Sequence, residues 1–295
     1  MNKGKLNILI AFPYFKKDLQ EFLTNEVDRS EFNLIVDSGA FTAWNIGKDI
    51  KLDDYCKFLD SIEHLRPFHA VQLDVFGDPE ASWKNYLIMK ERGYDAMPVF
   101  TRGESLDMLE EMYKHTDYIM FGGVVIGRGN RNYVKWFLER NNQRDTHWLG
   151  FVNMPFIKTY KPRSVDSSSW MMASRFGSMS LYSGAGEIKT FKKLQFAKPP
   201  TDEMIRCAKR TLLSPDELKI LAYKDAWIFN GHHDGNIDWR KEDKRSSAQF
   251  IGNMGHIMRA WEVEEQVGTK IYFAVGTHQM LRILFMSKRF LDQRR

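Results

Sequence analysis

Short apolar runs alternate with amphipathic stretches along the first 185 residues. The runs are apolar without strict alternation, which is typical of strands buried on both faces in a parallel sheet. Because eight such runs occur, the pattern favours a barrel closed on itself over a doubly wound sheet, which needs only five or six strands. The expected strands are Leu6–Phe12, Asn33–Asp37, Ala70–Asp74, Ala96–Phe100, Tyr118–Phe121, Trp148–Phe151, Ser164–Asp166 and, with the weakest pattern, Met179–Tyr182.

The stretches between these runs carry helical periodicity, and the pattern changes after Pro199-Pro200. Asp53 and Asp78 signal helix starts, the latter because Pro79 follows it at the first helical position. We therefore expect an α/β chain with a (β/α)8 TIM-type barrel over residues 1–198 and a mainly helical C-terminal extension over 199–295, packed on the barrel. The expected helices are Leu52–Leu65, Pro79–Arg92, Leu106–His115, Tyr133–Asn142, Thr201–Leu213, Pro215–Phe229, Ala248–Gln266 and Gln279–Leu291, with a polar segment at Gly231–Ser247 and a candidate strand at Lys270–Val275.

Composition places the chain among soluble globular proteins, since 43% of its 295 residues are hydrophobic and 27% are charged. The longest apolar patch, LNILIAFPYF, stops at Lys16 and Lys17, well short of the roughly 18 residues that a membrane span requires. The start has no small-residue cleavage site after that patch, so we interpret it as a first strand and not as a signal peptide. Two cysteines, Cys56 and Cys207, cannot build a disulfide framework, and we expect a reducing, cytoplasmic location.

The net charge of +5 is modest for a nucleic-acid-binding protein, but its distribution is uneven. Residues 187–210 and 282–295 each carry a balance of +4, so the remaining residues sum to 5 − 8 = −3. These two stretches are either a phosphate-contacting surface or simply solvated faces, and charge alone does not separate the two. The candidate contacts with a nucleic-acid backbone are Lys189, Lys192, Lys193, Arg282, Lys288 and Arg289.

Three aspartates share one local setting, in which an apolar run ends in Asp and a loop of small or polar residues follows. They are Asp37 in LIVDSGAFTAW, Asp74 in AVQLDVFGDPE and Asp166 in RSVDSSSW. In a parallel barrel the carboxyl ends of the strands converge on one face, where catalytic residues lie. A carboxylate there can be a nucleophile, a general base or a ligand for a polar substrate edge. Any one of them alone is more simply a helix cap or a turn residue, but this explanation is weaker for all three.

Two loops fit the same face of the expected barrel. Gly122 and Gly123 follow a strand in FGGVVIG, and without a Cβ they let backbone N–H groups approach a ligand. This loop lacks the lysine of a P-loop and the GxGxxG spacing, so a tight turn is the plainer explanation. The stretch from Ser38 to Phe41 places a small turn beside an aromatic ring, which suits stacking on a flat heterocycle unless Phe41 belongs to the core.

Four motifs in chain order resemble those of the tRNA-guanine transglycosylase superfamily. They are DSGAF, the GDPEASWKNY run after Asp74, FGG, and GFVNMP followed by YKPRSVDSSSW, and together they cover roughly residues 6 to 185. The resemblance implies a (β/α)8 barrel that exchanges a guanine in a nucleic acid for a 7-deazaguanine base without breaking the backbone.

The resemblance also implies roles for individual residues. Asp166 would be the nucleophile that attacks the sugar C1′, and Asp37 would be the general acid/base for the leaving or incoming base. Such a covalent intermediate splits the exchange into two displacements, as in retaining glycosidases, and the base must leave the stack to react. Asp74 would accept hydrogen bonds from the guanine N1–H and 2-amino group. The remaining residues expected around the base are Gly122 and Gly123 at its carbonyl oxygen, Phe41 on its ring, and Ser38, Thr101 and Trp170.

The chain departs from the family in ways that bear on its substrate. The zinc-containing tRNA enzymes carry three cysteines and a histidine after the nucleophile, whereas this chain has only Cys207 there, so we expect no zinc site and no cofactor. The glutamine contact after the fourth strand is replaced by Thr101 and Arg102. No terminal RNA-binding domain of the archaeal kind is visible. A short chain without zinc and with an N-terminal run such as LNILIAFPYF resembles the DNA-modifying branch of phages and bacterial modification islands. We therefore prefer DNA to tRNA as the nucleic-acid substrate, with a preQ0-like free base as the second substrate.

Other interpretations remain open at this point. The chain could exchange bases on tRNA, bind nucleic acid without catalysis, or act as a retaining glycosidase on small sugars. His232, His233 and Asp234 in NGHHDGN are more typical of a polar turn or a DNA contact than of a metal site. Met171 and Met172, beside Trp170, either line the base site or fill the core. The inserted deazaguanine, the sequence context, the oligomeric state and the role of the C-terminal helices are not determined by these patterns.

Overall fold

The computed structural model describes residues 4–124, 130–192, 195, 198–214 and 247–295. The chain divides into two compact units. The barrel unit comprises Asn7–Ser167 and Thr269–Thr277, and the second unit comprises Met1–Leu6, Ser168–Gly268 and His278–Arg295. The boundary expected at residues 198/199 is therefore wrong, because the second unit begins at Ser168 and the chain later returns to the barrel.

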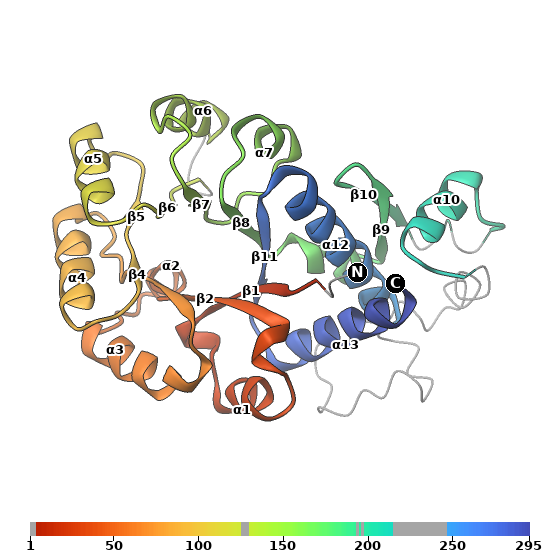
Figure 1. The fold of residues 1–295 in the computed structure, drawn as a ribbon, viewed down its shortest axis with the longest axis horizontal. Coiled ribbons are helices and arrows are strands. Elements are labelled where there is room, and N and C mark those ends of the chain that lie inside the picture. Colours follow the sequence, from red (N-terminus) through yellow and green to blue (C-terminus); the bar gives the residue numbers. More distant parts are fainter. Residues whose placement is uncertain (1–3, 125–129, 193–194, 196–197, 215–246) are drawn as a thin grey trace. The chain divides into compact units, whose positions relative to one another are not determined.

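Nine strand segments form one parallel sheet in the order β4-β3-β2-β1-β11-β8-β7-β6-β5, which confirms the expected barrel surrounded by helices (Figure 1). The two end segments, β4 and β5, are consecutive pieces of one strand position. Gln72 N donates to Met97 O at 3.0 Å on one side, and Met120 N donates to Pro98 O at 2.8 Å on the other. Pro98 has no N–H, so the strand is interrupted between β4 and β5. Its carbonyl still accepts a hydrogen bond from β6, so the sheet continues across this position. The segments are β1 (Leu6–Ala11), β2 (Phe32–Asp37), β3 (Phe68–Val71), β4 (Ala96–Met97), β5 (Val99–Phe100), β6 (Ile119–Phe121), β7 (Thr146–Trp148), β8 (Ser164–Ser167) and β11 (Lys270–Val275).

The eighth strand position belongs to β11, which pairs in parallel with both β1 and β8. The expectation that Met179–Tyr182 fills it is wrong. That run lies in β9 (Ser178–Gly184), which pairs antiparallel with β10 (Glu187–Lys192) in the second unit. Gly184, Ala185 and Gly186 all have positive φ, between 55° and 94°, and close a tight hairpin. A strand that turns back at once in this way cannot continue into the helical crossover of a parallel sheet.

Helices cover the outside of the barrel, as Figure 1 shows for α1 and for α3 to α7. The expected helices at 52–65, 79–92, 106–115 and 133–142 are confirmed within a few residues, and the Asp78 side chain caps α4 by accepting from Ala81 N at 2.9 Å. Asp53 lies inside the first turn of its helix, which begins after Lys51. The helical elements of this unit are η1 (Phe12–Tyr14), α1 (Lys17–Asn25), η2 (Arg29–Glu31), α2 (Ala40–Asn45), α3 (Leu52–Ser61), η3 (Glu63–Leu65), α4 (Pro79–Glu91), α5 (Leu106–His115), α6 (Asn130–Arg140) and α7 (Met154–Tyr160).

The barrel interior holds a cluster of buried apolar side chains. Because side chains alternate along a strand, the residue two positions further on points to the same side. Asp37 therefore points to the same side of β2 as Ile35, and Asp166 to the same side of β8 as Ser164. Both aspartates lie at the carboxyl end of the barrel. The cluster consists of Leu9, Ile35, Val71, Met97, Val99, Tyr118, Met120 and Tyr272, with Leu149 and Ala274 packed against it.

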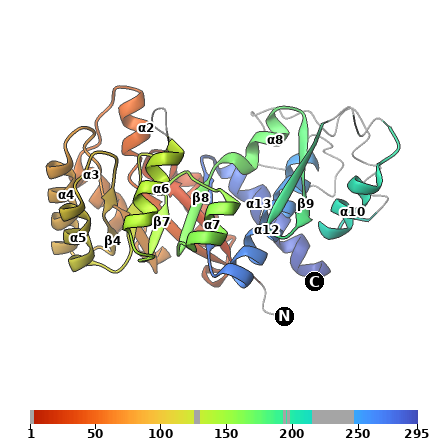
Figure 2. The same cartoon turned by 90° about the horizontal axis from the view of Figure 1, so that it is seen from above.

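The second unit packs its hairpin and helices on one another, and Figure 2 shows α12 between β9 and α13. The Trp261 side chain in α12 donates to Lys5 O at 3.0 Å and so ties the N-terminal segment to this unit. No helix among the described residues is long and apolar enough to cross a membrane. The helical elements are η4 (Ser169–Met171), α8 (Met172–Arg175), α10 (Asp202–Arg210), α12 (Ser247–Val267) and α13 (His278–Arg294); the expected helix at 215–229 and polar segment at 231–247 lie almost wholly outside the described residues.

Candidate active site

The barrel brings the three predicted aspartates to its carboxyl end. Asp37 ends β2, Asp166 lies in β8, and Asp74 follows β3 by three residues. They are close enough to act on one another electrostatically, because Asp166 raises the pKa of Asp37 and Asp37 raises that of Asp74. Like charges disfavour each other's ionised forms at short range. The strand-end rule therefore predicted a real cluster of carboxylates.

Asp166 is buried, and its Oδ1 has two hydrogen-bond partners. His147 Nε2 lies 3.1 Å from Asp166 Oδ1, and Gly150 N donates to the same oxygen at 2.8 Å. His147 is in β7, next to β8, and its ring is fully buried. Both hydrogen bonds go to Oδ1, so Oδ2 is the oxygen that they leave for other chemistry.

Asp37 has a markedly perturbed acidity. Burial is the main cause that raises its pKa to about 6, with a smaller contribution from Asp166, although a hydrogen bond from Gly39 N at 2.6 Å opposes the shift. Gly39 has φ 75°, and a Cβ there would come within 2.2 Å of Pro13 Cδ. The turn that presents Asp37 therefore requires glycine for both its backbone conformation and its space. The Asp37 side chain accepts from Gly39 N in this turn, but the N-cap of α2 is Gly39 itself, which has no side chain to cap the helix.

Asp74 and Glu104 extend the carboxylate cluster. Burial raises the pKa of Asp74 to about 7 against the effect of Gln72 Nε2, which donates to Asp74 Oδ1 at 2.7 Å. Burial and the charge of Asp74 likewise raise the pKa of Glu104 to about 7, while Thr101 N donates to Glu104 Oε2 at 2.6 Å. The two carboxyl groups thus titrate near neutrality, where small changes in their surroundings change their charge.

The sequence analysis missed two members of this site, Glu104 and His147. Glu104 lies in the TRGES loop directly after β5, so the strand-end rule that selected the aspartates would also have selected it. His147 is two residues before Leu149, so its side chain points to the same side, toward the barrel interior. A single histidine in an apolar strand is ordinarily read as core, so only the three-dimensional pairing with Asp166 reveals it.

The glycine loop after β6 is also at this end of the barrel. Gly122 N donates to Phe100 O at 2.9 Å in the sheet, so that N–H is already used. Gly123 has φ 70°, and a Cβ there would lie 3.1 Å from Arg102 N. Its N–H has no acceptor among the described residues and remains the candidate donor to a base carbonyl. The residues at 125–129 lie outside the described part of the chain.

Aromatic side chains flank the carboxylates on the loops after β2 and β3. Phe41 is 46% exposed, so the core explanation for it is wrong, and Trp44 in the same short helix is 53% exposed. Trp44 stacks on Phe76 with ring centroids 4.9 Å apart and planes 15° apart, and Phe41 lies 6.0 Å from Phe76. Flat exposed rings of this kind suit stacking on nucleobases. Ser38 is buried beneath this turn.

The remaining predicted residues belong to the second unit. Trp170 and Met171 are buried there and Met172 is 42% exposed, so the role of Trp170 at a base stays a prediction. Lys189 forms an ion pair with Glu203, Lys192 is exposed on β10, and Lys193 lies outside the described residues. On α13, Arg289 is exposed and Arg282 is partly buried.

Lys288 is wrong as a backbone contact. It is 2% exposed and pairs with Asp292 at 2.7 Å, because helical spacing of four residues places both side chains on one buried face. His232, His233 and Asp234 are outside the described residues. Among the described ones, no group of three or more His, Cys, Asp or Glu side chains could hold a metal ion.

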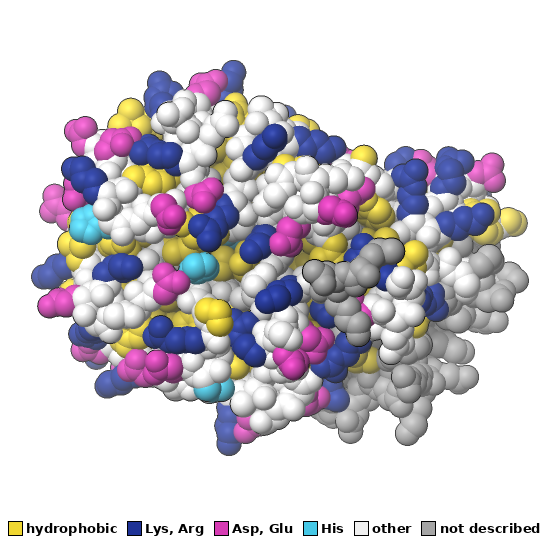
Figure 3. Space-filling model, in the orientation of Figure 1, with side chains coloured by type: hydrophobic (Ala, Val, Ile, Leu, Met, Phe, Trp, Pro, Cys, Tyr) yellow, Lys and Arg dark blue, Asp and Glu magenta, His cyan; other side chains and the backbone are white. Residues whose placement is uncertain are grey.

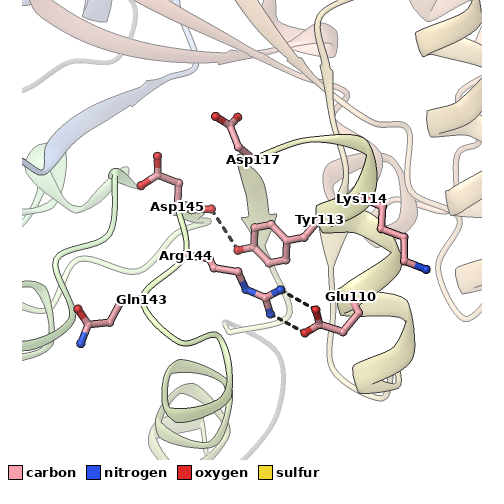
Figure 4. Close-up of a pocket in the computed structure, with 7 residues that line it drawn as sticks. All are labelled: Glu110, Tyr113, Lys114, Asp117, Gln143, Arg144 and Asp145. Atoms are coloured by element: carbon pink, nitrogen blue, oxygen red, sulfur yellow. Dashed lines mark hydrogen bonds and ion pairs between the residues drawn. The ribbon is translucent and has the colours of Figure 1, made fainter.

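Charge elsewhere on the molecule is mixed. On the face drawn in Figure 3, basic and acidic side chains are interspersed over the barrel. A hollow of about 630 Å³ lies at the opposite, amino end, between α5 and the loops that lead into β6 and β7 (Figure 4). Arg144 and Glu110 join there through two hydrogen bonds of 2.8 and 2.9 Å. Size alone would make this hollow a candidate site, but its Arg144 and Glu110 side chains are paired with each other and the carboxyl groups of raised pKa are not among its lining residues.

Comparison of the chain with protein-family models, curated proteins and solved structures gives no match. The site must therefore be interpreted from its own chemistry. That chemistry consists of one carboxylate held by two donors, a second of raised pKa beside it, two more that titrate near neutrality, and exposed aromatic rings at the rim.

Proposed function

We propose that the protein is a base-exchange transglycosylase that replaces a guanine in DNA with a 7-deazaguanine base through a covalent bond between Asp166 and the sugar. The observation that carries the proposal is the division of labour between Asp166 and Asp37. Asp166 is oriented with Oδ2 uncommitted, whereas Asp37 keeps a proton up to about pH 6. Two carboxylates in different environments are the usual basis for separate nucleophile and acid/base roles.

In the first displacement, Asp166 Oδ2 attacks C1′ and the bond from C1′ to the guanine nitrogen breaks. The electron pair stays with the base, which takes the proton of Asp37. In the second displacement, the ionised Asp37 accepts the proton of the incoming deazaguanine. The freed nitrogen pair then attacks C1′, and Asp166 leaves as a carboxylate. Asp37 ends protonated, as it began, so the exchange consumes no acid, base or cofactor.

Asp74 supplies the recognition of the base in this proposal. Its two oxygens match the N1–H and 2-amino donors of guanine and of a 7-deazaguanine that keeps this edge. The raised pKa of Asp74 has a consequence for binding. The two donors of the base favour the ionised carboxylate, so near pH 7 binding of the base releases the proton of Asp74. Burial and the charge of Asp74 raise the pKa of Glu104 as well, so Glu104 also holds a proton up to about pH 7 in the empty site.

The aromatic rim supports a nucleic acid as the larger substrate. A reacting base must leave its stack, and exposed rings beside the site compensate for the stacking that it loses. Phe41 and Trp44 in α2, which follows Asp37, provide such exposed rings, and Phe76 after Asp74 lies against both of them. The preference for DNA over tRNA rests on the sequence resemblance alone.

The test supplies the full chain with duplex DNA, single-stranded DNA and tRNA in parallel, each with labelled guanine or labelled preQ0. We expect label to enter DNA and a covalent protein–DNA adduct to form in the absence of free base. Asp166→Asn should abolish both, whereas Asp145→Asn at the amino end of the barrel is the matched control and should change neither. Incorporation into tRNA alone would move the same chemistry to RNA. Tight nucleic-acid binding without base release would contradict the proposal.

A further inference from the structure

A chain of buried hydrogen bonds leads through the barrel interior to Asp166. Tyr118 OH contacts Ser164 Oγ, Ser164 Oγ contacts His147 Nδ1, and His147 Nε2 contacts Asp166 Oδ1. His147 comes from β7, Ser164 and Asp166 come from the adjacent strand β8, and Tyr118 directly precedes β6, which pairs with β7 on its other side. Each of them is at most 6% exposed, so water does not substitute for a missing partner.

Donor and acceptor counting gives this chain a direction. Burial raises the pKa of Tyr118 to about 12, so its hydroxyl remains a donor at neutral pH. If Tyr118 donates to Ser164, the Ser164 hydroxyl donates to His147 Nδ1, and the neutral ring then carries its proton on Nε2, aimed at Asp166. In the opposite direction Nε2 would have no proton and would face the carboxylate oxygen as a second acceptor. The neutral ring therefore satisfies every member only when all donors point toward Asp166.

Other groups also surround this chain of hydrogen bonds. The Tyr272 ring from β11 meets His147 edge-on at 5.6 Å, and the Arg163 guanidinium lies 4.4 Å from the centre of the Tyr118 ring. Asp37 from β2 is the titratable group whose charge couples to Asp166 across the site. A donor from His147 offsets that like-charge interaction and favours the ionised carboxylate.

We propose that His147, fixed by Ser164 and Tyr118, is a positioning residue that holds Oδ1 of Asp166 and reserves Oδ2 for attack on C1′. The proposal rests on the proposed function for the reaction itself. Together with Gly150 N, His147 fixes the rotation of the carboxyl group, so that the attacking oxygen is defined before substrate binds. Preorganisation of this kind accelerates a displacement without contact between His147 and substrate.

The decisive comparison is His147→Asn against His147→Gln. A Gln amide nitrogen falls near the position of Nε2 and can donate to Asp166, whereas an Asn amide falls near Nδ1 and reaches only Ser164. We expect His147→Asn to slow covalent adduct formation with DNA about 10- to 100-fold, the range that partners of reactive ligands typically show. His147→Gln should restore most of the rate, with KM for the free base unchanged in both variants.

A second measurement separates this inference from the proposed function. The carbon chemical shift of the Asp166 carboxyl, measured by NMR at neutral pH in the resting protein, requires no catalysis. His147→Asn should change this chemical shift, because the carboxyl group loses the hydrogen bond to Oδ1, and His147→Gln should not. If the wild-type protein forms no adduct while the NMR difference is present, the proposed function fails and the positioning role stands. If Asn and Gln variants behave alike in both measurements, the positioning role is wrong. Ser164→Ala, with a smaller loss of volume, repeats the test should either variant fail to fold.

Discussion

The two ends of the barrel treat carboxylates in opposite ways. At the amino end several acidic groups have a cation beside them, and the pKa is lowered for Asp95 by His69 and for Glu110 by Arg144. At the carboxyl end the pKa values of Asp37, Asp74 and Glu104 are raised, because burial disfavours their charged forms and neighbouring carboxylates add to this effect. The amino-end pairs are Asp95 with His69, Glu110 with Arg144 and Asp145 with Arg163; the carboxyl-end groups with raised pKa are Asp37, Asp74 and Glu104.

This difference indicates that acidic groups contribute to stability at the amino end of the sheet and to function at its carboxyl end. Paired charges at the amino end favour the folded state, whereas buried, unpaired carboxylates disfavour it at neutral pH. A fold retains an unfavourable cluster where the cluster performs chemistry, and in barrels of this type that place is the carboxyl end. The comparison predicts that equivalent substitutions at the two ends have opposite signs for stability and very different sizes for activity.

The largest expected effect is on activity at the carboxyl end. Asp37→Asn should lower the rate of guanine release about 10²- to 10⁴-fold, the usual contribution of a general acid. In the wild-type protein the first displacement needs protonated Asp37, so its rate should fall as pH rises above about 6, and the variant should lose this limb. Single-turnover release of labelled guanine across pH 4 to 9 measures both. Asp145→Asn at the amino end is the control, and a comparable loss there would remove the distinction between the ends.

Next in size is the backbone that presents Asp37. Gly39→Ala should destabilise the protein by about 3 kcal/mol, because φ is 75° and the new Cβ would collide with Pro13. Gly93→Ala, in the turn between α4 and β4 at the amino end, has φ 84° but nothing within 4 Å of the new Cβ, so strain alone should destabilise it by about 1 kcal/mol. Urea unfolding of both variants measures the difference. An equal loss of unfolding free energy in both variants would show that the Pro13 ring moves away from the new Cβ without a cost in stability.

The sequence predicted the barrel and most of the acidic cluster because both follow local rules. Buried parallel strands are continuous apolar runs, and Asp37, Asp74 and Asp166 stand where those runs end. The identity of the eighth strand was not predictable in this way. Lys270–Val275 pairs with β8 across more than 100 residues, while Met179–Tyr182 lies much nearer to β8 in the sequence but turns back at a hairpin.

The role of His147 and the raised pKa values were beyond sequence patterns for a related reason. A histidine in an apolar strand becomes part of a site only through the residue that faces it on the next strand, here Asp166. Raised pKa values depend on burial and on the spacing of like charges, which residue order does not contain. Glu104 is different, because its position directly after a strand follows the same local rule that selects the three aspartates.

Neutralising a carboxyl group at the functional end should stabilise the fold. Asp74 keeps its proton up to about pH 7 in the folded protein but ionises near pH 4 when unfolded, so the folded state binds more protons and its stability falls as pH rises between these values. Asp74→Asn should therefore raise the free energy of unfolding by on the order of 2 kcal/mol at pH 8 and by almost nothing at pH 4. Urea unfolding at the two pH values measures this gain. A variant destabilised at pH 8 would mean that the carboxylate is compensated in the empty site.

The smallest effect belongs to the amino end and should have the opposite sign. Glu110→Gln keeps the shape of the side chain but removes the charge that pairs with Arg144, and both groups are largely or partly exposed. Exposed pairs contribute little, so the loss should be about 0.5 kcal/mol at pH 7 and low salt. Because the pKa of Glu110 is lowered in the folded protein, this contribution is present above pH 4.5 and disappears as pH falls through the folded value, the reverse of Asp74. Added salt should reduce it as well, since screening acts on exposed charges. A Glu110→Gln variant more stable than wild type at pH 7 would mean that charges at this end are also retained for a purpose other than stability.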